Sequence, residues 1–310
     1  MTGSPHSDSH RPTALRTALA FATVYLVWGS TYLAIRFAIE TIPPLLMAGF
    51  RYVVSGVALY AWVLARGQAA RPTRAQWTAA TLLGGLFFLG GNGGVTWAEQ
   101  MVPSGLTSLI IATVPLWLVL LEWCRTRGAR PDLLTSAGLL IGFAGVALLL
   151  SARNGPAGTV IHPLGGLVLL GATLSWAAGT IYAKHLPRPA SILQTGAMQM
   201  LAGGVLLCIA GALAGEVPKV RFAEISARSF ASLLYLTVAG SAIAFSAYAW
   251  LLQTSTPARV GTYAYVNPIV AVALGWGLGG EVVGPRTLLA GATVVAGVAL
   301  IITARGRTRA

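Results

Sequence analysis

The chain has 310 residues, of which 55% are hydrophobic and only 9% are charged, and its formal net charge is +13. An average soluble domain carries about 25% charged residues, so this composition excludes a water-solvated globular surface and indicates a lipid bilayer as the solvent. It also excludes nucleic acid as a partner, because the basic residues lie between apolar runs rather than on a polar domain with interleaved aromatic residues.

Ten apolar segments follow one another along the chain and predict an all-α integral membrane protein. At about 1.5 Å per residue, each segment covers about 30 Å of hydrocarbon. The first is too long for a signal-peptide core, so we expect an uncleaved first helix. A polar cytoplasmic tail is expected before the segments and a basic cytoplasmic tail after them. The segments are 16–38, 44–65, 76–97, 103–124, 132–151, 163–185, 191–213, 228–250, 257–279 and 285–304, and the tails are 1–15 and 305–310.

The basic residues between the segments predict how the chain is oriented. With the N-terminus inside, the inner tails and links carry fourteen Lys and Arg residues and the outer links carry six. This is the positive-inside bias, so we expect both termini in the cytoplasm and the chain in the cell membrane. The outer link 216–228 departs from the bias, because it contains three of the six.

The second half of the chain repeats the first. Trp28 aligns with Trp176 at an offset of 148 residues, and Pro115 aligns with Pro268 at an offset of 153. Each repeat holds five predicted helices, and an odd number turns the second copy upside down in the membrane. Inverted repeats suit alternating access, with a binding site near the midplane. The predicted repeats are 16–151 and 163–304.

Glycines and an amide occupy "GGNGG" at 90–94, inside the third apolar segment. In lipid the backbone must stay hydrogen-bonded, so we expect a helix here unless the run borders a cavity. The glycines are expected to let neighbouring helices approach closely, whereas Asn92 is expected to face a cavity. Further glycine pairs at four-residue spacing predict packing seams: Gly138/Gly142, Gly211/Gly215 and Gly275/Gly279.

Pro115 and Pro268 occupy matched positions in the fourth and ninth segments. A proline inside a helix frees a carbonyl and kinks the helix, so the pair predicts either two static bends or two hinges that line the transport path. Asn267 directly precedes Pro268, where its amide is expected to hold a ligand or to bond the freed carbonyl.

Aromatic and polar residues near the helix ends complete the candidate site. Each tryptophan has an alternative reading as an interfacial anchor. Gln100 and Gln253, each one turn after a tryptophan, are expected at opposite faces of the membrane. The candidate cavity residues are Trp28, Ser30, Tyr32, Asn92, Trp97, Gln100, Trp176, Tyr182, Tyr263 and Asn267.

Arg51 lies about 10 Å inside the second predicted helix and is costly there unless it is compensated. We expect it to extend its side chain to the interface, to pair with Glu40, or to meet an anionic solute. The repeat places Gln199 opposite Arg51, and Gln253 is the other polar residue expected within the membrane.

No carboxylate or imidazole is expected at mid-membrane, which argues against a membrane-embedded protease or a metal enzyme. The chain has no phosphate loop followed by Lys-Ser or Lys-Thr, so ATP is not expected to drive it. We therefore predict no catalytic residues, no metal and no cofactor. Cys124 and Cys208 fall within predicted helices and imply neither a disulfide framework nor a metal site.

Three stretches resemble the EamA family of the drug/metabolite transporter superfamily: "VYLVWGSTYLAIRFAIETIPPLLMAGFRYVVSG", "LIIATVPLWLVLLEW" and "YAYVNPIVAVALGWGLGGE". The resemblance implies ten helices, cytoplasmic termini, and a central cavity formed by helices 1, 3, 4, 6, 8 and 9. It also implies export or exchange of amino acids, their derivatives or amphipathic toxic compounds. The second copy departs from the pattern, since "WAAGT" replaces "WGST".

These observations predict a secondary transporter, an exporter of small metabolites working by alternating access. A channel-like facilitator and a membrane-embedded enzyme are the alternatives. The expected partners are a small-molecule substrate and the lipid bilayer, and a homodimer stays open.

Overall fold

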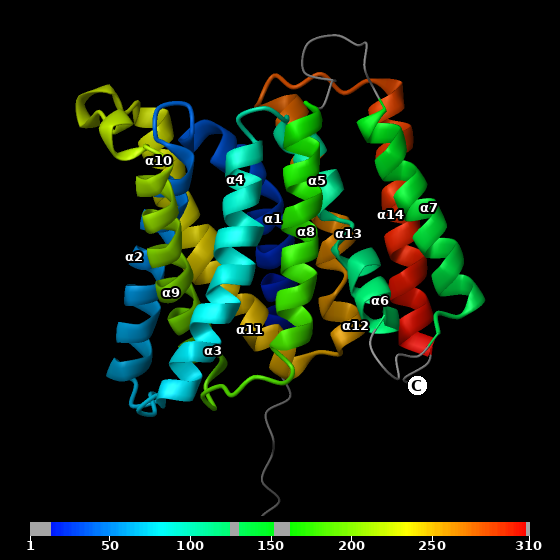
Figure 1. Ribbon diagram of the computed structural model, residues 1–310. Helices are drawn as coiled ribbons and strands as arrows, with labels where there is room; N and C mark the ends of the chain where they lie inside the picture. The colour runs from blue at the N-terminus through cyan, green and yellow to red at the C-terminus, as the bar shows by residue number, and fades with distance from the viewer. Residues whose placement is uncertain (1–13, 125–129, 152–161, 308–310) are drawn as a thin grey trace, which may run out of the picture.

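The computed structural model describes residues 14–124, 130–151 and 162–307. Across these ranges the chain is helical with no strand, and the helices stand side by side in one bundle (Figure 1). The first half contains α1 (Ala14–Ala38), α2 (Pro44–Ala65), α3 (Arg74–Gly84), η1 (Gly85–Gly93), α4 (Gly94–Ala98), α5 (Ser104–Ile111), α6 (Val114–Cys124) and α7 (Leu133–Leu150). The second half contains α8 (Pro163–Tyr182), α9 (Ile192–Leu213), η2 (Val217–Lys219), η3 (Phe222–Glu224), α10 (Ala227–Tyr235), η4 (Leu236–Ile243), α11 (Ala244–Thr254), α12 (Pro257–Val260), α13 (Tyr263–Gly277) and α14 (Pro285–Arg307).

Local sequence explains where several helices begin. Pro163 opens α8, where a missing N–H costs nothing because the first turn has no internal acceptor for it. Thr73 and Gln76 form a capping box that starts α3. Ser191 starts α9 by accepting a hydrogen bond from the Gln194 main-chain N–H at 3.3 Å.

Eight helical runs in the described ranges are long and apolar enough to cross a membrane. They are 14–38, 44–65, 104–124, 133–150, 163–182, 192–213, 227–254 and 285–304. The runs 74–98 and 263–277 lie outside this set, although α3, η1 and α4 together extend over the height of the bundle (Figure 1).

Four predicted helices are interrupted in the structure. The segments 76–97 and 228–250 each change to a wider π-helical turn midway, at η1 and η4. The segment 103–124 divides into α5 and α6 just before Pro115, as the missing proline N–H leads one to expect. The segment 257–279 divides into α12 and α13, but its break precedes Tyr263, and Pro268 lies inside a continuous helix.

In each of the two π-helical segments a short polar side chain donates to a main-chain carbonyl of its own helix. In η1 the Asn92 Nδ2 donates to the Phe87 carbonyl at 3.2 Å, and in η4 the Ser241 Oγ donates to the Leu236 carbonyl at 3.0 Å. Each donor lies five residues after its acceptor. The two halves of the chain thus share this contact, in which a side chain bonds the wider helical turn that carries it.

Glycines allow the closest helix approaches, as predicted for "GGNGG". A Cβ on Gly91 would lie 2.9 Å from Trp176 Cε3, and one on Gly94 would lie 3.0 Å from Ala172 Cβ. The Gly138/Gly142 seam is also present, since a Cβ on Gly297 of α14 would lie 2.5 Å from the Gly142 nitrogen. Small residues at such contacts let two backbones approach.

The prediction for Gly215 is wrong. Its φ of 71° lies in the left-handed region, and a Cβ there would meet nothing within 4 Å. Gly215 turns the chain after α9 ends at Leu213 rather than packing a helix, because glycine adopts this conformation without steric cost.

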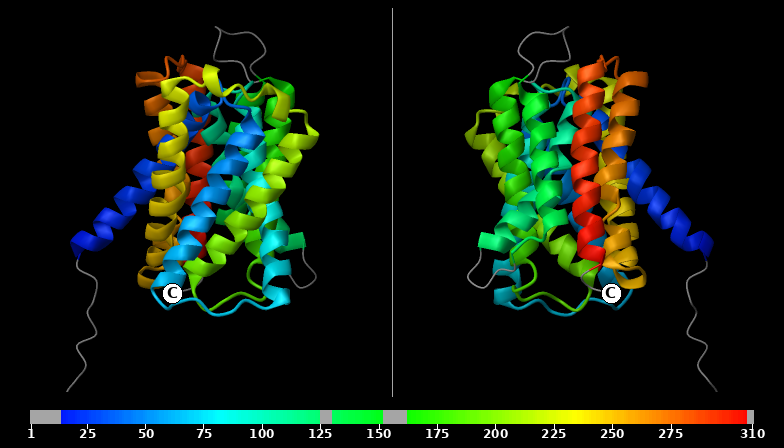
Figure 2. Two further views of the ribbon diagram at one scale, coloured as in Figure 1. Left: turned by 90° about the vertical axis from the view of Figure 1, so that its left-hand side faces the viewer. Right: turned by 90° about the vertical axis from the view of Figure 1, so that its right-hand side faces the viewer.

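The bundle has two ends, which we name by the links that lie there. The α2–α3 and α8–α9 links mark the proximal end, where α14 also finishes (Figures 1 and 2). The α1–α2 link and the segment with η2 and η3 mark the distal end. The first turns of α1 lean away from the bundle toward the proximal end (Figure 2).

A candidate substrate cavity

A cavity of about 450 Å³ extends from the middle of the bundle toward the proximal end. Tyr32 and Asn267 line its deep part, while Gln76 and Arg188 line the part near the proximal links. This volume falls in the range of about 300–1,000 Å³ that small-molecule sites occupy.

One wall of the cavity is a cluster of three aromatic rings. Trp28 of α1 lies 5.0 Å from Tyr248 of α11 and 5.4 Å from Tyr263 of α13, measured between ring centroids. The two tyrosine rings are 5.8 Å apart and meet edge to face. The Trp28 Nε1 donates to the Gly240 carbonyl at 3.1 Å, which fixes the indole against η4. The cluster offers a rigid apolar surface to a solute.

The opposite wall is built from α8 and η1. Trp176 packs on Phe87 with ring centroids 5.0 Å apart, and Gly91 leaves room for the Trp176 indole. Tyr52 and Phe88 form a further pair at 4.4 Å. Both walls are therefore aromatic, and in each a tryptophan contacts a glycine of a π-helical segment, Gly240 through its carbonyl and Gly91 through ring packing.

Arg51 is buried in this cavity and does not extend its side chain to the interface. Only 5% of it is exposed, its Nε donates to Ser241 Oγ at 2.8 Å, and its guanidinium lies 4.7 Å from the centroid of the Tyr52 ring. The charged lining residues are Arg51 and Arg188, and no carboxylate lines the cavity within the described ranges. The site is therefore electropositive at its polar positions.

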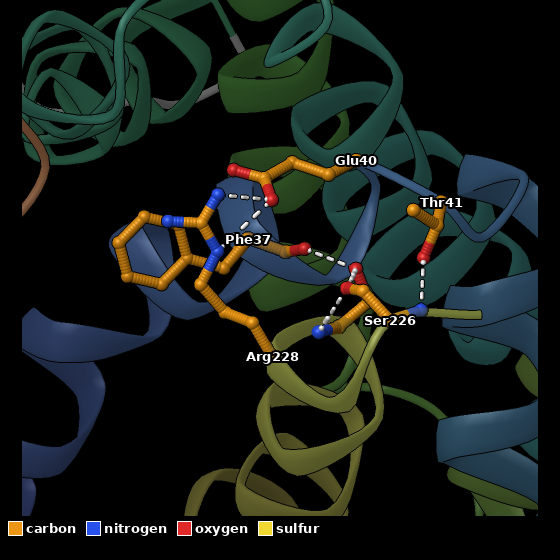
Figure 3. Close-up of polar contacts among 6 residues, drawn as sticks. Phe37, Glu40, Thr41, Ser226 and Arg228 are labelled. Atoms are coloured by element: carbon orange, nitrogen blue, oxygen red, sulfur yellow. Dashed lines mark hydrogen bonds and ion pairs between the residues drawn. The ribbon is translucent and has the colours of Figure 1, made fainter. Parts of the chain in front are cut away.

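The predicted pairing of Arg51 with Glu40 is wrong, because Glu40 lies at the distal end and pairs with Arg228 (Figure 3). The Arg228 Nε donates to Glu40 Oε2 at 3.0 Å, and its guanidinium covers the Phe37 ring. The Ser226 N–H donates to Thr41 Oγ1 at 3.2 Å in the same region. These contacts tie the end of α1 to the start of α10.

The two predicted amides and both prolines line the cavity. The Asn92 Nδ2 donates one N–H to the Phe87 carbonyl. The Asn267 Oδ1 is buried and accepts no hydrogen bond from any residue that the structure describes. An amide oxygen left without a donor is costly, so it marks a position where a donor on a solute would be favoured.

The structure divides the other predicted residues between the cavity and other places. Trp28, Tyr32, Trp176, Gln199 and Tyr263 line the cavity. Trp97 and Gln100 line a separate hollow at the distal end. The side chains outside both hollows are Ser30, which bonds the Tyr235 hydroxyl at 2.6 Å, Tyr182, which is 54% exposed, and Gln253, which is exposed.

Sequence reasoning missed several residues of the aromatic and polar lining, and three of them share one helix face. Ser241, Phe245 and Tyr248 all line the cavity. Their spacing of four and seven residues puts them on one face of a helix, which is the signal that could have found them.

The distal end of the cavity is closed by buried residues and by two capped helices. Ala98, Val102 and Ile110 have no exposed surface. The Glu281 carboxylate accepts from the Ser104 N–H at 2.6 Å and the Gly105 N–H at 2.9 Å, which caps the start of α5. Glu216 caps α2 in the same way, by accepting from Leu45 and Leu46. A carboxylate is favoured at a helix N-terminus, so both contacts hold this end together.

The comparison with known families settles what kind of protein this is. The family model described as EamA-like transporter family matches residues 15–151 and again residues 163–303. The chain belongs to the EamA-like transporter family. It is thus a multi-pass membrane protein of a transporter family, as the resemblance in its sequence predicted, and the family name does not denote an enzyme.

Curated relatives of this EamA protein carry transporter names. A protein of Escherichia coli K12 named "Uncharacterized inner membrane transporter YedA" is 41% identical over 283 residues, which cover 91% of this chain and 89% of the relative. "Uncharacterized transporter YvbV" of Bacillus subtilis is 29% identical and covers 83% of this chain and 82% of its own. "Protein PecM" of Dickeya dadantii is 26% identical, over 81% of this chain and 80% of the relative.

A solved structure titled "Crystal structure of protein" has the same fold. It aligns with a TM-score of 0.62 and 22% identity, over 92% of this chain and 96% of its own. At this identity the likeness shows the fold alone.

Proposed function

We propose that this EamA protein is a secondary transporter that exports small metabolites by alternating access. The observation that carries the proposal is the cavity itself, which is open toward the proximal end and sealed at the distal end. A carrier needs a site that faces one compartment at a time, whereas a channel needs a continuous path. The alternating-access carrier is therefore the better account.

The proposal includes ten membrane spans in two inverted five-helix repeats. The runs 74–98 and 263–277 join the eight apolar runs as the two further spans, because both lie within the bundle and line the cavity. In the positive-inside orientation the proximal end faces the cytoplasm, together with both termini. The open cavity then receives its substrate from the cytoplasm, which suits export.

The lining groups favour a substrate with a carboxylate and an apolar body. Arg51 supplies a buried positive charge, and the described lining of the cavity contains no carboxylate. Asn267 Oδ1 is free to accept from an amine, and the Trp28, Tyr248 and Tyr263 rings offer apolar contact. Amino acids and their derivatives combine these features, so they are the first substrate class to test.

Pro115 and Pro268 are proposed as flexible points that move during the cycle. α5 and α6 are already separated before Pro115, while α13 is continuous through Pro268. The two halves thus start from different helix geometries. A single chain encloses the cavity, so the proposal requires no second copy, and a homodimer stays a prediction.

Counterflow in proteoliposomes tests the proposal. Vesicles are loaded with an unlabelled amino acid or toxic analogue, and the same labelled compound is added outside, one member of the panel at a time. A carrier accumulates the label transiently and saturates, whereas a pore dissipates the gradient. Failure of every member of the panel to show counterflow would contradict the amino-acid assignment, and equilibration without accumulation would replace the carrier with a channel.

Cysteine labelling tests the inverted repeats separately. Single cysteines are placed in the link after α1 and in the link after α8, and intact cells are treated with a membrane-impermeant maleimide. The proposal expects the first link to react from outside and the second to be protected. Reaction of both links from the same side would contradict the inverted topology.

A further inference from the structure

The Glu99 carboxylate caps no helix that the structure describes and is not one of the groups proposed to contact the substrate. It follows α4, none of its surface is exposed, and neither of its carboxylate oxygens has a hydrogen-bond partner within the described ranges. Its main-chain carbonyl, by contrast, accepts from Arg36 Nη1 at 2.5 Å. The backbone is therefore held in place while the acid group is left free.

The other glutamates of the distal end show what a structural carboxylate looks like here. Glu281 accepts from the Ser104 N–H and hydroxyl and from the Gly105 N–H, and Glu216 accepts from two main-chain N–H groups. An ionised carboxylate buried without such donors costs several kcal/mol or more. Glu99 is thus suited to burial as the neutral acid and not as the ion.

The surroundings of Glu99 supply charges of both signs. Glu281 lies close enough to oppose ionisation of Glu99, and Arg36 and Arg51 lie close enough to favour it. Tyr32 of α1 is a further titratable group near Glu99, and Tyr52 of α2 lies near Arg51. α4 also packs against α8 and η1. η1 contains no titratable residue, and the one titratable residue of α8 is Tyr182, at the proximal end of that helix.

Glu99 also lies where the cavity meets the sealed layer. Its N–H donates to the carbonyl of Val95, which lines the cavity one helical turn earlier. Its neighbours Ala98 and Val102 have no exposed surface and belong to the seal. Opening the distal end would bring water to Glu99, and closing it would remove that water.

We propose that Glu99 is a proton-binding site whose occupancy permits the distal end to close. With the distal end open, the hydrated carboxylate takes one proton from a hydronium ion, an O–H bond forms on the carboxyl group, and water is released. The neutral acid is then buried as the seal forms, and reopening returns the proton to water. This inference rests on the proposed alternating access and makes closure of the distal end depend on the pH of the water on that side.

A thiol at the seal reports closure without any transported solute. Val102→Cys is introduced into full-length protein whose Cys124 and Cys208 are replaced by serine, and the protein is reconstituted in lipid nanodiscs. The rate of labelling by a maleimide is measured from about pH 5 to about pH 8, the range in which carboxylates of shifted affinity titrate. Ala223→Cys, exposed at the same end, supplies the intrinsic pH dependence of the reaction.

With Glu99 present, the labelling rate of Val102→Cys, divided by that of Ala223→Cys, is expected to rise about tenfold or more from the low to the high end of this pH range. Each pH unit changes the ratio of protonated to ionised carboxyl groups tenfold. Glu99→Gln, which mimics the neutral acid, is expected to stay at the slow rate at every pH. Glu224→Gln, an exposed acid of the distal end that pairs with Arg221, is expected to keep the normal response. Should Glu99→Gln fold poorly, Glu99→Met provides a neutral side chain of similar length that needs no hydrogen bond, with the same expected result.

Two outcomes would overturn the inference. A flat response with Glu99 present would mean that Arg36 and Arg51 hold the acid ionised throughout, and an unchanged response in Glu99→Gln or Glu99→Met would assign the proton to another group. Neither outcome touches the counterflow result. Conversely, a Glu99-dependent response in a protein that shows no counterflow would keep the proton site and remove the carrier.

Discussion

The surroundings of Trp28 and Trp176 share one architecture. The two tryptophans are 148 residues apart, and the glycines that they contact are 149 apart: Trp28 bonds the Gly240 carbonyl, and Trp176 packs against Gly91. Trp28 of the first half rests on η4 of the second, and Trp176 of the second half rests on η1 of the first. This reciprocal exchange is what an inverted duplication would produce, so it supports the proposed repeats.

The chemistry around the two tryptophans differs. Beside Trp28 lie two tyrosine rings and the Arg51–Ser241 hydrogen bond. Beside Trp176 lies Phe87, and Gln199 stands where the repeat would place a second arginine. The π-helical turns and the glycine contacts are therefore present in both halves, while the charge and most of the polar groups are present in one. We infer that the Trp28 side binds the substrate and that the Trp176 side mainly shapes the cavity.

Among the substitutions that test this difference between the two sides, neutralising Arg51 should have the largest effect on substrate binding. Hydrogen bonds to charged groups contribute about 1.5–3 kcal/mol, so Arg51→Gln is expected to raise the half-saturating solute concentration in counterflow about 10- to 100-fold. Gln199→Ala, at the matched position, is expected to change it less than about threefold, as suits a neutral side chain at the cavity wall.

The matched pair also provides the control. Both variants are purified and compared by size-exclusion chromatography, so that a loss of folded protein is not read as a loss of binding. Equal effects of Arg51→Gln and Gln199→Ala would show that the two sides bind alike and would remove the inferred asymmetry.

For alanine substitutions at Gly91 and Gly240, the larger loss of stability is expected on the Trp176 side, at Gly91. A Cβ on Gly91 would lie 2.9 Å from Trp176 Cε3, whereas on Gly240 its nearest neighbour would be Thr31 Cγ2 at 3.1 Å. Gly91→Ala is therefore expected to destabilise the fold by about 1–3 kcal/mol, the usual cost of overpacking. Gly240→Ala should cost less, because a small shift of Thr31 relieves it. Thermal unfolding in detergent measures both, and a greater loss from Gly240→Ala would contradict the assignment.

Hydropathy predicted the helical bundle, because membrane-spanning helices depend on the spacing of apolar residues along the chain, and the resemblance of three stretches to EamA proteins predicted the transporter family. They could not predict the π-helical turns. These turns arise where glycine, asparagine and serine let a helix widen against its neighbours, and a twenty-residue apolar window does not detect them. The break before Pro115 and the continuous helix through Pro268 likewise come from two prolines that look equivalent in sequence.

The candidate site was predictable where a residue is anomalous in an apolar segment. Asn92, Asn267 and Arg51 stood out for this reason, and all three line the cavity. The partner of Arg51 was not predictable, because Ser241 is 190 residues away and only the fold brings it near. Glu99 did not stand out, because it follows the predicted segment 76–97 and its complete burial depends on neighbouring helices that no local pattern reveals.

The smallest expected difference concerns the tryptophans themselves. Phenylalanine keeps an aromatic ring but cannot donate to the Gly240 carbonyl. A neutral hydrogen bond contributes about 0.5–1.5 kcal/mol net, so Trp28→Phe should raise the half-saturating solute concentration in counterflow about 3- to 10-fold. Trp176→Phe should stay within about twofold, because Trp176 meets η1 through its ring face and edge rather than through such a bond. A larger loss from Trp176→Phe would move the binding surface to the α8 side. The two halves would then have exchanged the roles assigned to them here, with Arg51 left to stabilise the π-helical segment η4.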